Sequence, residues 1–162
     1  MKGRSLKWLR YLHLLSVSIW FGTTAGIGAL AFIGFSNQSE TYFMSIAPLI
    51  PLFYKIIILP IAIFTILQGF IYGFCTKWRF FKHRWVLLKW FFTLLLIPCI
   101  GAGTIGQIFS VMDTIDRSGF QGGLSDGGTV LLSISLQILI MMIMIGISVF
   151  KKPQKQDKYK LP

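Results

Sequence analysis

The sequence predicts an all-α integral membrane protein, a four-helix bundle with up-down-up-down topology. Four apolar segments, at about residues 11–35, 48–75, 85–108 and 129–150, each exceed the about 20 residues that cross a bilayer. Backbone polar groups inside lipid must pair within their own segment, so segments of this length are helical. Only short links separate the four spans, and residues 1–162 therefore form a single transmembrane domain.

The distribution of charge predicts the orientation of the bundle. Thirteen of the sixteen basic residues lie before the first span, between the second and third, or after the fourth. Four of the five acidic residues lie in the two other links. An even number of spans separates the basic segments, so the positive-inside rule places both termini in the cytoplasm. We expect this basic face to contact anionic lipid headgroups rather than nucleic acid, at about 1 kcal/mol per nearby Lys or Arg.

The first span, residues 11–35, is expected to be a retained anchor, because its apolar run is too long for a secretory signal. Gly22 and Gly26 form a GxxxG pattern, and Ser18 lies one turn earlier on the same helix face. Such a face permits close helix packing in lipid. We expect it to meet another span, with a homodimer seam as the alternative.

The second and third spans, residues 48–75 and 85–108, are expected to be antiparallel neighbours, because their link is short. The third contains the string GxGxxG at residues 101–106. A nucleotide-binding fingerprint requires a strand before it and a helix after it. These glycines are therefore expected to permit close packing or a kink.

The fourth span, residues 129–150, follows a glycine-rich link at residues 113–128. The sequence predicts that this link is a mobile external loop. The polar, charged tail at residues 151–162 is expected to be disordered.

Two residues near the cytoplasmic ends of the spans are candidates for chemistry. His13 is the single histidine in a predicted span, and imidazole binds haem iron, copper or zinc; an interfacial, hydrogen-bonded histidine is the alternative. Lys89 lies five residues beyond Arg84, about 7.5 Å deeper along the helix. A lysine at this depth either faces the bundle interior with a partner or extends back to the headgroups.

Two further polar positions are predicted from depth and residue type. Gln68 can make an interhelical hydrogen bond or contact a ligand, and Gln137 is expected to bond between helices. Met144 and Ser148 reach the depth of His13 and Lys89 from the fourth span. Met144 is either a weak axial haem ligand or a packing residue.

Four strings resemble a group of small bacterial membrane proteins. The strings are LHLL at residues 12–15, IWFG at 19–22, Pro60 with QG at 68–69, and WVLLK at 85–89. The group includes copper-resistance D-type proteins, membrane protoporphyrinogen oxidases and uncharacterised four-span relatives. The resemblance implies that His13 is a haem ligand and that Lys89 is catalytic or binds a substrate carboxylate. The basic segment that follows the first span in the oxidases has no counterpart at residues 36–45.

Three functional hypotheses follow. The leading one is a bacterial inner-membrane protein that binds haem b or a related porphyrin near its cytoplasmic side, with a redox role as an option. His13, Lys89, Gln68 and Met144 would form that site. The second is a non-enzymatic accessory subunit that docks to a larger membrane complex. The third is copper handling through His13 and the methionines of the fourth span.

Overall fold

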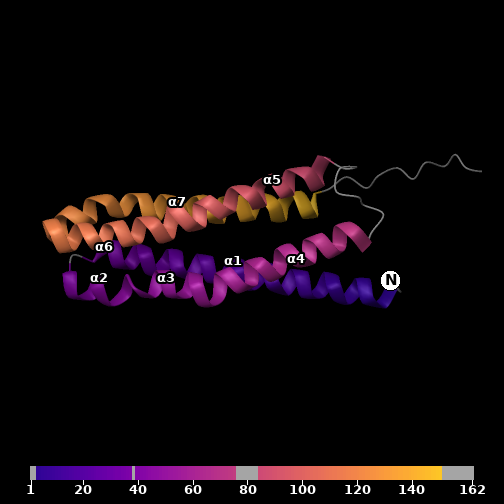
Figure 1. The fold of residues 1–162 in the computed structure, drawn as a ribbon, viewed down its shortest axis with the longest axis horizontal. Coiled ribbons are helices and arrows are strands. Elements are labelled where there is room, and N and C mark those ends of the chain that lie inside the picture. Colours follow the sequence, from indigo (N-terminus) through magenta and orange to yellow (C-terminus); the bar gives the residue numbers. More distant parts are fainter. Residues whose placement is uncertain (1–2, 38, 76–83, 151–162) are drawn as a thin grey trace, which may run out of the picture.

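A computed structural model describes residues 3–37, 39–75 and 84–150 (Figure 1). Within these ranges every secondary-structure element is a helix and no strand occurs, which confirms the all-α class. The link at residues 76–83, with His83, and the tail at residues 151–162 lie outside the described residues.

The first half of the chain forms one straight helix and one segmented helix. The first span is α1 (Gly3–Ser36), which has no break. The second is built from α2 (Glu40–Ile46), α3 (Leu49–Phe53), the π-helical segment η1 (Tyr54–Ile58) and α4 (Leu59–Cys75). Ser39 caps α2, because its hydroxyl accepts the backbone N–H of Tyr42 at 3.4 Å. The second span thus begins eight residues earlier than Pro48, where the sequence predicted its start.

The second half repeats this plan in reverse order. The third span contains α5 (Arg84–Pro98), the π-helical segment η2 (Cys99–Gly106) and α6 (Gln107–Ser118). The fourth is the single helix α7 (Phe120–Val149). Pro98 lacks a backbone N–H and ends the regular hydrogen bonding of α5 where η2 begins.

The predicted mobile loop at residues 113–128 is wrong. In the structure α6 and α7 are separated by Gly119 alone, whose φ of 81° favours glycine. The remaining glycines of this segment lie inside α7, and two of them permit close helix contacts: a Cβ at Gly123 would overlap the Ile115 side chain, and one at Gly127 would overlap the Phe35 ring. Glycine was therefore a signal of packing here and not of a loop.

Four stretches are long and apolar enough to cross a membrane, which identifies a multi-pass membrane protein. They are Lys7–Ser36, Glu40–Ile71, Val86–Ser118 and Phe120–Val149. The second, third and fourth extend beyond the predicted spans toward one end of the bundle, where acidic residues lie. We call this the acidic end, defined by Glu40, Asp113, Asp116 and Asp126.

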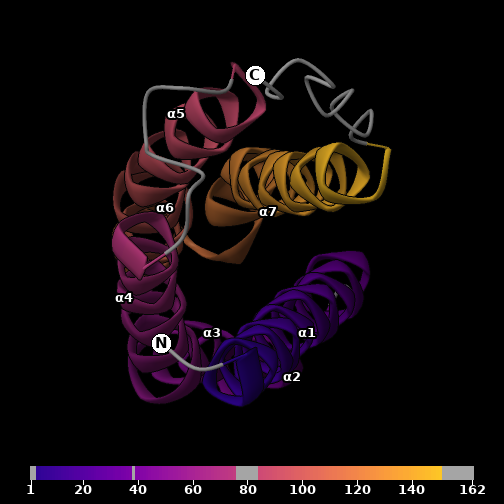
Figure 2. The same ribbon diagram turned by 90° about the vertical axis from the view of Figure 1, so that its right-hand side faces the viewer.

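The helices pack in two layers (Figure 1). One layer holds α1 beside the α2–α4 stretch, and the other holds α7 beside α5 and α6. Helix α1 also contacts α7, which joins the layers (Figure 2). The start of α1, the end of α4, the start of α5 and the end of α7 lie together at the right of Figure 1. We call this the basic end, defined by Lys7 and Arg10.

Candidate functional site

Polar side chains from all four spans lie near the basic end and form what we call the His13 cluster. Its members are His13 from α1, Gln68 from α4, Lys89 and Thr93 from α5, and Met144 and Ser148 from α7. Helical spacing explains the position of His13. His13 lies three residues before Ser16 on the buried face of α1 that continues to Trp20 and Thr24, because residues three or four apart share a helix face.

His13 and Gln68 are the unusual pair in this cluster. The imidazole of His13 interacts with the side chain of Gln68 and with the charge of Lys89. Gln68 is only 3% exposed, yet neither atom of its amide group has a hydrogen-bond partner, and neither does the buried Nδ1 of His13. Such a group costs about 1–3 kcal/mol when it is left unsatisfied. Buried orphaned polar atoms are rare in folded proteins and require an explanation. The interhelical hydrogen bond predicted for Gln68 is not formed in this structure.

Lys89 extends across the bundle to α7. Its Nζ donates a hydrogen bond to Ser148 Oγ at 2.5 Å, and Ser148 donates to the carbonyl oxygen of Met144 at 2.9 Å. The charge of the same ammonium group also acts on the His13 imidazole.

Met144 is connected to the same cluster through Thr93. The Thr93 hydroxyl lies 2.9 Å from the carbonyl oxygen of Lys89 and 3.8 Å from the Met144 sulfur. Of the neighbouring methionines, Met141 is buried, whereas Met142 is 55% exposed. Clustered thioethers are typical copper ligands, and copper handling through His13 and these methionines stays a prediction.

The carboxylates that the structure describes lie far from the His13 cluster. The spans do contain acidic residues, contrary to the prediction, but at the acidic end. Asp113 follows Lys89 by 24 residues of the same span, which corresponds to about 36 Å along the helix. Among the residues that the structure describes, no group of three or more His, Cys, Asp or Glu could hold a metal ion.

A second polar network, which the sequence indicated only through Gln137, lies in the middle of the bundle. Tyr54 donates its hydroxyl to Gln137 Oε1 at 3.0 Å, and Gln137 Nε2 donates to Thr104 Oγ1 at 2.6 Å and to the Cys99 carbonyl at 3.2 Å. The interhelical bond predicted for Gln137 is confirmed. Tyr54 begins η1, and Cys99 and Thr104 belong to η2, so both π-helical segments meet this glutamine. A π-segment breaks the regular bonding of a helix and can leave carbonyls such as that of Cys99 to a side chain.

The GxxxG face of α1 was expected to meet another span, but no described helix packs against it. Gly22 and Gly26 are exposed, and a Cβ at either would meet no described atom within 4 Å. The homodimer seam, the alternative interpretation, stays a prediction.

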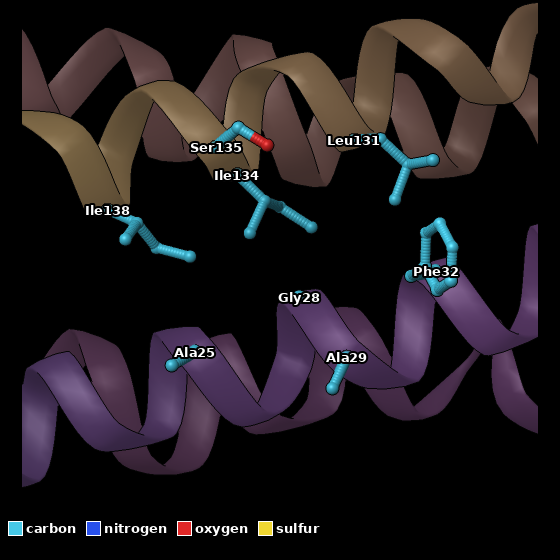
Figure 3. Close-up of a pocket in the computed structure, with 8 residues that line it drawn as sticks. All are labelled: Ala25, Gly28, Ala29, Phe32, Leu131, Ile134, Ser135 and Ile138. Carbon is cyan, nitrogen blue, oxygen red and sulfur yellow. The ribbon is translucent and has the colours of Figure 1, made fainter.

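An apolar groove opens between α1 and α7 (Figure 3). Its volume is about 240 Å³, and its lining residues are Ala25, Gly28, Ala29, Phe32, Leu131, Ile134, Ser135 and Ile138. Ala25 follows His13 by twelve residues of α1, about 18 Å along the axis. The groove is therefore separate from the His13 cluster, and its lining suits hydrocarbon.

No protein-family model, curated protein or solved structure matches this chain. The resemblance described from its four strings therefore stays a prediction, and the arguments that follow depend on the geometry.

The Gln137 network generates a stability prediction. Gln137→Met keeps the side-chain size but removes the acceptor of the Tyr54 hydroxyl and the donor to Thr104. We expect it to lower the free energy of unfolding by about 1–2 kcal/mol, measured by unfolding in detergent micelles. Gln107→Met is the control, because Gln107 bonds Thr129 at an exposed position. Equal stability of the two variants would contradict a stabilising role for the network.

Proposed function

We propose that this protein binds haem or a related porphyrin in the His13 cluster. The observation that supports this best is the buried set of unpartnered polar atoms on His13 and Gln68 beside the charge of Lys89. A ligand with both a metal and an anionic group could use these side chains, because the metal can bind an imidazole nitrogen and the anionic group can accept from the Gln68 amide N–H. The apolar helices around the cluster suit a macrocycle that is mostly hydrocarbon.

The residues present fit such a cofactor by their chemistry. Imidazole and thioether side chains both bind haem iron in proteins, so His13 and Met144 would hold the iron. The Lys89 ammonium can pair with a propionate, because charge-assisted hydrogen bonds are stronger than neutral ones. Haem, when bound, supplies one-electron chemistry that the side chains of this chain cannot supply. The catalytic role of Lys89 follows from the family resemblance alone and is proposed on that basis.

We also propose that the bundle is up-down-up-down, with both termini in the cytoplasm of a bacterial inner membrane. Lys7 and Arg10 lie at the basic end and Glu40, Asp113, Asp116 and Asp126 at the other, which is the asymmetry that the positive-inside rule interprets. The His13 cluster then lies on the cytoplasmic side.

The second candidate function, an accessory subunit of a membrane complex, has its own support. The Gly22 and Gly26 face points away from the other described helices. Among the side chains of α5 that the structure describes, Leu96 is the buried one. The Gly22–Gly26 face of α1 and the exposed side chains of α5 are both available for contact with another membrane protein.

The orientation is tested by labelling introduced cysteines in intact cells, in a chain whose two native cysteines are replaced. We expect a membrane-impermeant reagent to label Asn37→Cys and Ser118→Cys, since both positions are exposed near the acidic end. Lys7→Cys, at the basic end, should be labelled only after the membrane is permeabilised. The reverse pattern would overturn the orientation.

The cofactor proposal is tested by the absorption spectrum of the purified protein. We expect a Soret band in the parent and its loss in His13→Ala, because the iron would lose its imidazole. His83→Ala is the matched control, since the chain contains only these two histidines, and it should keep the band. Full haem occupancy in His13→Ala would remove His13 from the ligand role. Folded parent protein without haem, produced with ample haem, would favour the accessory subunit.

The proposed role of Lys89 predicts an effect of charge on haem retention. We expect Lys89→Met to weaken haem binding about tenfold, equivalent to about 1.4 kcal/mol, and Lys89→Arg to preserve part of it. Lys55→Met is the control, because Lys55 is an exposed lysine in η1, on the second span and outside the His13 cluster. Haem titration monitored by absorbance gives the dissociation constants. Identical constants for the parent and all three variants would show that Lys89 contributes only as an interfacial lysine.

A further inference from the structure

We propose that Gln68 is a positioning residue that fixes the tautomer of His13. In this arrangement His13 carries its proton on Nδ1 and donates it to Gln68 Oε1, which leaves the Nε2 lone pair for a metal. The metal-binding step depends on the proposed function, whereas the interaction between the two side chains does not.

The environment of Gln68 leaves few other roles for its amide group. Gln68 lies on the buried face of α4 with Ala62 and Thr65, and at 3% exposure its amide is shielded from water and lipid headgroups. The Thr65 hydroxyl donates to the carbonyl of Ile61 at 2.7 Å within its own helix. On the facing helix, Ser16 likewise donates to the carbonyl of Leu12 at 2.8 Å. The nearby hydroxyl protons are thus committed to the backbone.

His13 Nδ1 is the complementary group. It is buried and without a partner, its side chain interacts with that of Gln68, and the two come from α1 and α4, which pack side by side. A small change in side-chain torsion would convert this contact into an aligned hydrogen bond and would satisfy one orphaned atom on each residue. Burial of both groups makes that bond favourable, because the alternative is two unsatisfied polar atoms.

The chemistry of imidazole explains why this bond matters. A neutral imidazole carries one proton, and the hydrogen bond made by one ring nitrogen decides which nitrogen can bind a metal. Histidines that bind metals almost always donate the other N–H to an acceptor, which fixes the ring orientation. Gln68 Oε1 supplies such an acceptor, and its NH₂ group then points its donors toward a ligand bound in the same cluster.

The tautomer can be read directly in protein without a cofactor. Histidine labelled with ¹⁵N gives signals from two residues, and His83→Gln removes one of them. We expect His13 of the cofactor-free protein to be protonated mainly on Nδ1. Gln68→Met, which lacks the acceptor, should shift the proton toward Nε2, and Gln68→Glu, which keeps an acceptor, should retain the parent pattern.

A matched control separates positioning from general loss of stability. Gln137→Met makes the same chemical change at a buried glutamine that bonds Tyr54 and Thr104 instead, and it should leave the His13 tautomer unchanged. If Gln68→Met fails to fold, the His13 tautomer of the parent protein tests the proposal by itself. A parent His13 protonated mainly on Nε2 overturns the proposal. An unchanged tautomer in folded Gln68→Met also overturns it.

Haem affinity tests whether the His13–Gln68 hydrogen bond helps His13 to bind a metal. We expect Gln68→Met to bind haem 10–100-fold more weakly than the parent, about the range typical when the partner of a metal-binding histidine is lost, with Gln68→Glu closer to the parent. A shifted tautomer with unchanged affinity would overturn the role toward the metal. Absence of haem binding in the parent would overturn the proposed function and leave the tautomer measurement to decide the His13–Gln68 pair.

Discussion

The structure depends on one constraint: a polar group inside the bilayer must find its partner within the protein. The backbone meets this constraint by being helical in nearly every described residue. The small hydroxyl side chains meet it by bonding to the preceding turn, as Thr24 does to the Trp20 carbonyl at 2.9 Å. Gln137 meets it through three helices at once, with Tyr54 from the second span and Thr104 from the third. Against this background the unsatisfied atoms of His13 and Gln68 are conspicuous.

The two glutamines show how the same residue type can serve different ends. Gln137 is held where two π-helical segments face a regular helix, and its donors and acceptor are all used. Its network fixes the relative positions of the second, third and fourth spans. Gln68 is equally buried but keeps its hydrogen-bonding capacity unused. A paired glutamine stabilises the bundle, whereas an unpaired one lowers its stability until a group such as the His13 imidazole or a bound ligand pairs with it.

The sequence predicts how deep a residue lies along the helix axis, but it does not predict which neighbour the residue faces around that axis. Each residue advances about 1.5 Å along a helix, so counting along the spans predicted a shared depth for His13, Lys89 and Ser148, and Lys89 interacts with both of the others. The face that a residue presents requires an amphipathic pattern. Apolar residues surround α1 on all sides, so nothing in the sequence showed that the face of Gly22 and Gly26 points outward.

The prediction of a mobile loop between α6 and α7 failed for a related reason. Glycine has the same composition signature in a loop and in a tight helix contact, and only the partners Ile115 and Phe35 distinguish the two cases. The π-helical segments were also hidden, because Pro98 indicates a break in regular bonding but not the conformation that follows it. The contacts of Gln137 with Tyr54 and Thr104 depend on those segments and could not be anticipated individually.

The single-residue turn at Gly119 has a consequence for how the protein enters the membrane. With no polypeptide between α6 and α7 beyond this glycine, the third and fourth spans form one helical hairpin. Under the proposed orientation, its tip must cross the hydrocarbon layer with the charges of Asp113, Asp116, Arg117 and Asp126. Arg117 forms an ion pair with Asp113 at 3.1 Å, so two of these four charges lie beside an opposite charge. The hairpin is therefore suited to insertion as one unit, with both helices entering the bilayer together.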